Sequence, residues 1–359
     1  ARDPNRLAEV RRHALIGLRE AAASKDGKRS LTFYTNGRGV ELGIPSGMTF
    51  CDQWVKEAFM NRDMFNRFTS VSYGLDPDRS YLDYAAWWWK KMIETGACDY
   101  LYWDDIFCTA NFNLVGTDAY KLPDGSIQPA TGIFNMRSCV RRCAVLQAEM
   151  GRTCHKNWVH MTNTALAPVL AFAGTNYDWE DVAGDTSLQE RYSRANIQAQ
   201  SLGRQFGNRV AVMGYFGTRD KEKLAKLQRW GTGAVITHEI QWHRVKEWRE
   251  ANKMLEKWGY RLPTTQVWNY WDEDIAFPVA ITGGENAALA LRRADGEALI
   301  VVSDWEKGGD YVVTPDIRAL GIRPGFTAYD FESGRELPVV DGMIKTTLSK
   351  FDYVMINLR

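Results

Sequence analysis

The chain alternates, up to Tyr260, between short apolar runs and longer segments whose apolar residues recur at helical spacing. Short runs bounded by turn residues predict strands, and the longer segments predict helices. The predicted strands cover residues 31–35, 67–73, 99–103, 157–161, 175–178, 210–213 and 233–237. The predicted helices between them cover residues 81–95, 133–150, 187–205 and 219–230. This alternation favours an α/β fold of the (β/α)8 TIM-barrel type.

The pattern changes near Arg261. Beyond it, short strands are separated by Gly-containing turns without intervening helices, which is typical of an antiparallel β-sandwich. The predicted strands cover residues 287–292, 298–303, 310–314, 326–330, 343–348 and 353–358. We therefore expect two domains, a barrel over residues 1–262 and a β-sandwich over residues 263–359.

The beginning of the chain predicts a capped amphipathic helix over residues 3–22. A helix in an alternating fold normally follows a strand, so we expect N-terminal residues upstream of Ala1 to complete the barrel. A missing N-terminal segment and a homo-oligomer both stay open. No signal peptide begins the chain, and no apolar run approaches the ~20 residues of a membrane span. A removed signal also stays open, because the sequence starts without Met.

Charge and composition narrow the class of partner. The 45 Lys and Arg residues nearly balance the 44 Asp and Glu residues, and the two signs are interspersed. Nucleic acid and an acidic membrane face are therefore not indicated. The 14 Trp and 15 Tyr residues suit the flat faces of sugars, although large cores use such rings as well.

The six cysteines form no C-x-x-C pair. Cys139 and Cys143, with His155, make a poor zinc set, so free buried thiols are expected. Free thiols favour a reducing compartment, while secreted, periplasmic and cytoplasmic locations all stay open. No Gly-rich phosphate loop follows a strand, and no G-x-S-x-G elbow occurs, so the sequence implies no cofactor and no serine nucleophile.

Candidate chemistry gathers where predicted strands end, because the loops after barrel strands converge on one mouth. Asp105 and Glu180 are the expected catalytic carboxylates: one protonates the leaving oxygen, and the other stabilises positive charge at the anomeric carbon or activates water. Capping a loop or pairing with arginine is the structural alternative for both. The expected orienting or sugar-binding residues are Tyr34, Trp103, Asp104, His160, Asn163, Asp178, Trp179, His238 and Glu239. No tight ligand spacing supports a metal site made of Asp104, Asp105, His160 and Glu180.

Several motifs resemble one group of proteins. They are Tyr102-Trp-Asp-Asp105 with Phe107 and Asn113, Asp124-Gly-Ser-Ile-Gln-Pro129, residues 172–180, Val302-Ser-Asp-Trp305, and Ala328-Tyr-Asp-Phe-Glu-Ser-Gly334. Over residues 70–359 the chain resembles glycoside hydrolases related to family 123, which have a (β/α) barrel followed by a β-sandwich. Family 123 enzymes proper act on β-linked N-acetylgalactosamine through an adjacent Asp-Glu pair, whereas the adjacent pairs here are Asp104-Asp105 and Glu180-Asp181.

The resemblance implies a glycosidase acting on an oligo- or polysaccharide, with Asp105 and Glu180 as the first residues to test. Two other interpretations stay open. One is a non-catalytic carbohydrate-binding or scaffold protein on a barrel fold. The other is a polysaccharide lyase, which would need a Tyr or His base beside a cation that neutralises a uronate.

Overall fold

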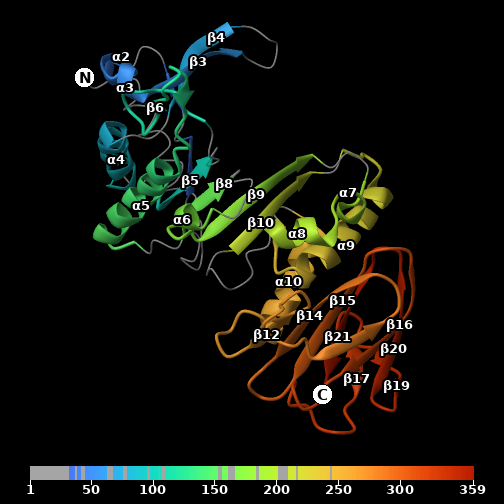
Figure 1. The fold of residues 1–359 in the computed structure, drawn as a ribbon. Helices are drawn as coiled ribbons and strands as arrows, with labels where there is room; N and C mark the ends of the chain where they lie inside the picture. The colour runs from blue at the N-terminus through green and yellow to red at the C-terminus, as the bar shows by residue number, and fades with distance from the viewer. Residues whose placement is uncertain are drawn as a thin grey trace. The chain divides into compact units, whose positions relative to one another are not determined.

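The computed structural model describes residues 32–36, 39–41, 45–62, 68–75, 79–94, 98–104, 106, 110–152, 156–160, 166–182, 186–200, 209–215, 217–242 and 245–359. The helix predicted over residues 3–22 lies outside these residues. The chain divides into two compact units, and the boundary falls between Asp178 and Trp179. Figure 1 shows the elements of each unit.

A parallel sheet forms the centre of the first unit. Its strands lie in the order β1 (Thr32–Asn36), β5 (Tyr100–Asp104), β8 (Trp158–His160) and β9 (Thr175–Val182), and each neighbouring pair is parallel. Helix α4 (Arg79–Glu94) precedes β5, α5 (Ile133–Glu149) precedes β8, and α6 (Ala167–Leu170) precedes β9. The structure therefore contains the strands predicted over residues 31–35, 99–103, 157–161 and 175–178. Strand β9 continues beyond its predicted end.

Smaller elements complete the first unit. Strands β2 (Gly39–Glu41), β4 (Phe68–Leu75) and β3 (Val55–Arg62) form a separate antiparallel sheet in that order. Residues 67–73 were expected to be a barrel strand, and that expectation was wrong. The segment alternates between apolar residues and serine, and such alternation is typical of antiparallel rather than buried parallel strands. The remaining elements are α2 (Pro45–Thr49), α3 (Cys51–Trp54) and the hairpin β6 (Tyr120–Lys121) to β7 (Ile127–Gln128).

The second unit contains further helix and strand elements of the α/β part. These are α7 (Leu188–Arg191), α8 (Arg194–Gln200), β10 (Arg209–Tyr215), α9 (Lys221–Thr237), β11 (Gln241–Trp242) and α10 (Lys246–Trp258). Strands β10 and β11 pair in parallel. The single helix predicted over residues 187–205 is divided into α7 and α8. The expectation of a strand over residues 233–237 was wrong, because these residues form the last part of α9.

The close packing of α9 explains that error. A Cβ atom at Gly231 would overlap the ring of Trp242, and one at Gly233 would lie 2.7 Å from the Cβ of Tyr353. The glycines let the helix approach both β11 and the sandwich closely. Residues 231–237 are all buried, and they include the short apolar run Ala234-Val-Ile236, which a buried strand also has.

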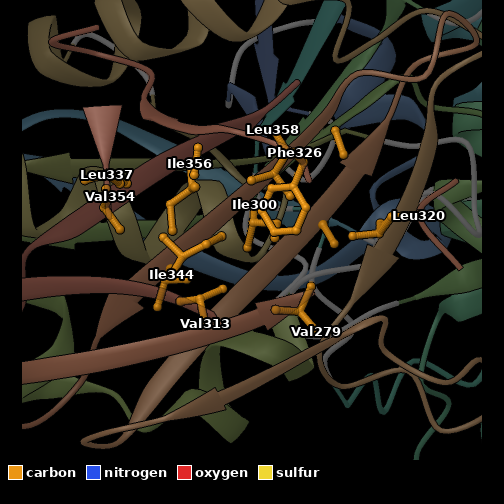
Figure 2. Close-up of a cluster of buried hydrophobic side chains, with 14 of the residues drawn as sticks. Val279, Ile300, Val313, Leu320, Phe326, Leu337, Ile344, Val354, Ile356 and Leu358 are labelled. Carbon is orange, nitrogen blue, oxygen red and sulfur yellow. The ribbon is translucent and has the colours of Figure 1, made fainter. Parts of the chain in front are cut away.

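Antiparallel strands make up the rest of the second unit, as the sequence predicts for residues beyond 263. One sheet has the order β12 (Gln266–Asn269), β14 (Asn286–Arg292), β15 (Ala298–Asp304), β21 (Tyr353–Leu358), β17 (Ala328–Asp330) and β18 (Glu336–Leu337). The other has the order β13 (Val279–Thr282), β16 (Gly308–Pro315), β20 (Met343–Ser349) and β19 (Val339–Val340). Side chains that include Ile300, Val313, Ile344 and Ile356 form the buried core shown in Figure 2.

The architecture is thus an α/β fold of the TIM-barrel type followed by antiparallel sheets. No helix among the described residues is long and apolar enough to cross a membrane.

Candidate active site

The ends of neighbouring parallel strands bring polar residues of the first unit into register with one another. Asn36 pairs with Asp104 across β1 and β5, and His160 pairs with Tyr177 across β8 and β9. Trp103 pairs with Val159, so Asp104 and His160 lie one residue further along both strands. The sequence reasoning placed Asp104 and His160 at strand ends, and the register brings them together.

Asp104 is held from two neighbouring strands. The hydroxyl of Tyr34 on β1 donates to its Oδ2, and the Nδ1 of His160 on β8 lies 2.8 Å from its Oδ1. The side chain of His160 is 3% exposed and that of Asp104 is 17% exposed, whereas Tyr34 is 57% exposed. The cluster therefore reaches from the buried sheet towards solvent.

A buried pair of amides positions β8 beside β5 and α5. Asn157 precedes β8, and its Oδ1 accepts from the backbone N–H of Leu101 at 3.2 Å and from the Nε2 of Gln147 at 2.7 Å. Its Nδ2 donates to the Oε1 of Gln147 at 2.6 Å. Beyond the strands, the N–H of Ile106 donates to the carbonyl of His160 at 3.0 Å. These bonds fix the backbone on both sides of His160.

Aromatic rings surround this cluster on the same face of the sheet. The ring of Tyr34 stacks on that of Tyr102 with centroids 5.5 Å apart, and the ring of His160 lies 5.7 Å from that of Tyr102 and 6.2 Å from that of Tyr177. Trp158 contacts Tyr177 at 4.8 Å. The result is a carboxylate and an imidazole set among flat amphipathic rings, a combination that suits a polar ligand with apolar ring faces.

Three of these aromatic residues were missing from the predicted site residues: Tyr102, Trp158 and Tyr177. The signal that could have found them is the period of two along a strand. Tyr102 is two residues from Asp104, and Trp158 is two residues from His160, so each shares a face with its partner.

The same period places Trp103 on the opposite face. Its ring is fully buried and meets the ring of Trp89 on α4 edge-on, with centroids 4.6 Å apart. Trp103 thus belongs to the packing between sheet and helix and not to the face that carries Asp104.

His238 and Glu239 also lie elsewhere. They follow the C-terminus of α9 and precede β11, so they stand before a strand instead of after one, and the expectation that they end a strand was wrong. His238 is fully buried: its Nδ1 bonds to the carbonyl of Ala234 at 2.7 Å, and its Nε2 to the hydroxyl of Tyr270 at 2.9 Å. Glu239 accepts from the hydroxyl of Tyr260 at 3.1 Å.

The other predicted residues are described only in part. Asp105 and Asn163 lie outside the described residues. Asp178, Trp179 and Glu180 lie on β9, where the structure describes the strand but not these side chains. Their assignment to the site stays a prediction.

Among the described residues, no group of three or more His, Cys, Asp or Glu side chains is placed to hold a metal ion. Cys98, Cys139 and Cys143 are buried and are not joined in disulfide bonds. Burial, with a smaller contribution from Asp99, raises the pKa of Cys98 to about 12, so this thiol is protonated and unreactive at neutral pH.

Comparison with known proteins relates the fold to glycoside hydrolases. Neither models of protein families nor curated protein sequences match the chain. Among solved structures, an Anoxybacillus α-amylase is similar with a TM-score of 0.55 and 9% identity, covering 95% of this chain and 78% of the amylase. A GH27 β-L-arabinopyranosidase from Geobacillus stearothermophilus gives a TM-score of 0.51 and 14% identity, covering 84% of this chain and 67% of the enzyme.

The isomalto-dextranase of Arthrobacter globiformis T6 gives a TM-score of 0.54 and 13% identity, covering 96% of this chain and 60% of the enzyme. These structural neighbours are TIM-barrel glycoside hydrolases with C-terminal sheet domains. At such low identity the likeness shows the fold.

Proposed function

We propose that this chain is a glycoside hydrolase that cleaves a glycosidic bond in an oligo- or polysaccharide. The observation that carries the proposal is the placement of Asp104, bonded to Tyr34 and His160, at the ends of parallel strands among aromatic rings. In TIM-barrel enzymes this end of the strands carries the reactive groups. The glycosidase neighbours support the same class of reaction.

The chemistry requires two carboxyl groups with different tasks. One protonates the leaving glycosidic oxygen, and the other stabilises the positive charge that develops at the anomeric carbon, by direct attack or by activating water. We propose Asp105 and Glu180 for these tasks, since each lies just beyond the predicted end of a strand: Asp105 comes two residues after Trp103, and Glu180 directly follows Trp179. Asp104 and Asp178 would then orient the reacting groups. The proposal includes a relationship between this chain and glycoside hydrolase family 123.

The experiment is a screen of the purified chain against aryl glycosides and natural polysaccharides, followed by Asp105→Asn and Glu180→Gln on the best substrate. Loss of a general acid is expected to reduce kcat by about 100- to 10,000-fold. The general acid is identified by comparing substrates with different leaving groups. An activated aryl leaving group needs little protonation, so the loss of kcat in the acid variant should be smaller on such a substrate than on a natural saccharide. Asp341→Asn and Glu273→Gln, both at exposed positions, are the matched controls.

Three outcomes would contradict the proposal. Near-normal turnover in both Asp105→Asn and Glu180→Gln would remove the assigned carboxylates. Sugar binding without hydrolysis of any substrate would indicate a carbohydrate-binding scaffold. Products with the ultraviolet absorbance of an unsaturated sugar ring would indicate a lyase.

A further inference from the structure

The proton position on His160 follows from what surrounds Asp104. Oδ2 of Asp104 accepts from the hydroxyl of Tyr34, and Oδ1 faces the Nδ1 of His160 at 2.8 Å. A neutral imidazole carries one proton, on Nδ1 or on Nε2, and the bond between the two residues needs exactly one proton. Either Nδ1–H donates to a carboxylate, or a protonated Asp104 donates to a bare Nδ1.

The burial of the two side chains favours the first arrangement. Asp104 is 17% exposed and reaches the side of the sheet where Tyr34 is 57% exposed, so its carboxylate retains access to water. A donor on each oxygen stabilises the charged carboxylate, because ionised acceptors form the stronger hydrogen bonds. In a carboxylic acid, one of the two oxygens would carry the proton and act as a donor instead of accepting a hydrogen bond.

We propose that Tyr34 and His160 are positioning residues that fix Asp104 as an oriented anion, with His160 donating through Nδ1–H. Tyr34 constrains the carboxylate from β1 and His160 constrains it from β8, so its plane is set by two strands. The rings of Tyr102 and Tyr177 flank the imidazole and limit its rotation. The consequence for catalysis rests on the proposed glycosidase function, whereas the proton position does not.

The first experiment reads the proton directly. In a protein labelled with ¹⁵N-histidine, the long-range ¹H–¹⁵N spectrum separates protonated from bare ring nitrogens. The chain has five histidines, and comparison with His160→Asn assigns the signals of His160. A protonated Nδ1 across neutral pH supports the proposal. A bare Nδ1 with a protonated Nε2 overturns it.

The second experiment uses two substitutions that place an amide at different ring positions. The side-chain nitrogen of His160→Asn falls near Nδ1 and can still donate to Asp104, whereas that of His160→Gln falls near Nε2. We expect His160→Gln to reduce kcat by about 100-fold, with a smaller change in KM, and His160→Asn to retain most of the turnover. Equal losses in both variants would overturn the positioning role.

Tyr34→Phe removes the other donor and should reduce kcat by about tenfold. Tyr120→Phe is the matched control, because Tyr120 is 56% exposed and lies in the β6–β7 hairpin. Equal effects of these two substitutions would count against the role of Tyr34. Thermal unfolding of each variant establishes that it is folded. If the unmodified chain hydrolyses no glycoside, the proposed function fails, and the ¹⁵N result still decides the state of His160.

Discussion

The guanidinium carbon of Arg229 on α9 lies 3.7 Å from the ring centroid of Tyr353 on β21. The same guanidinium donates to Asp352 at 2.8 Å, to Glu332 at 2.8 Å and to the carbonyl of Tyr353 at 3.0 Å. It also forms an ion pair with Glu247 on α10 at 3.4 Å. One side chain thus links the helices of the second unit to the sandwich sheet.

Removal of this side chain should destabilise the second unit. We expect Arg229→Met to lower the free energy of unfolding by about 3 kcal/mol, because partly buried carboxylates lose their counter-charge and Tyr353 loses its cation. The free energy of unfolding of Arg229→Lys should lie between those of the unmodified protein and Arg229→Met, because lysine keeps the charge but lacks the planar guanidinium group. Urea denaturation followed by circular dichroism measures the differences. A loss no larger than that of Arg219→Met, at an exposed position before α9, would contradict the prediction.

A second prediction concerns the buried imidazole of His238. The carbonyl of Ala234 can only accept, so Nδ1 carries the proton and Nε2 accepts from Tyr270. Burial lowers the pKa of His238 to about 4, helped by the charge of Arg194 and opposed by the bond to Ala234. The ring of Trp271 stacks on the imidazole at 5.1 Å, so an added charge there would be poorly hydrated.

The depressed pKa of His238 makes stability depend on pH in a defined direction. The unfolded chain takes up a proton below about pH 6.5, whereas the folded chain resists it until about pH 4. The neutral His238 therefore contributes about 3 kcal/mol to the free energy of unfolding above pH 6.5, and this contribution is lost as the pH falls from about 6.5 to about 4. Urea denaturation at a series of pH values tests this. His238→Gln should reduce the slope of the free energy of unfolding against pH between about pH 4 and 6.5. An unchanged slope in that variant would show that His238 is not the source of the pH dependence.

The sequence predicts the central strands of the first unit because their apolar runs are short and bounded by turn residues. It also places Asp104 and His160 at strand ends, which is where the structure has them. The distance between the two residues could not be predicted, because strand register depends on pairing between segments far apart in the chain. The face on which Trp103 lies follows from alternation along β5, which turns its ring away from Asp104 and towards Trp89.

Helix α9 shows where pattern reasoning fails. A surface helix can be recognised in a sequence because one face is apolar and the opposite face is polar. Residues 231–237 are all buried, so this part of α9 has no solvent-facing polar side. Gly231 and Gly233 serve the close approach of the helix to Trp242 and Tyr353. Only the packing partners, which are distant in sequence, distinguish the two interpretations.

One sequence motif has a structural explanation. Asp304, in Val302-Ser-Asp-Trp305, is fully buried at the end of β15. Its Oδ1 accepts from the hydroxyl of Tyr311 and from the N–H of Gly308 at 2.9 Å. Its Oδ2 accepts from the N–H groups of Phe351 at 2.8 Å and Glu306 at 3.2 Å. The carboxylate therefore ties the turn after β15 to the start of β16 and to the segment that precedes β21.

Asp304→Asn tests this role with a change of almost no volume. The amide nitrogen can only donate, so it would face donors where the carboxylate oxygen accepted, and buried N–H groups would lose their acceptor. We expect the free energy of unfolding to fall by about 3 kcal/mol. Asp310→Asn is the matched control, because Asp310 is exposed on β16 and accepts one hydrogen bond from Thr347 at 2.7 Å. If urea denaturation gives the two variants the same stability, the buried carboxylate does not organise these turns.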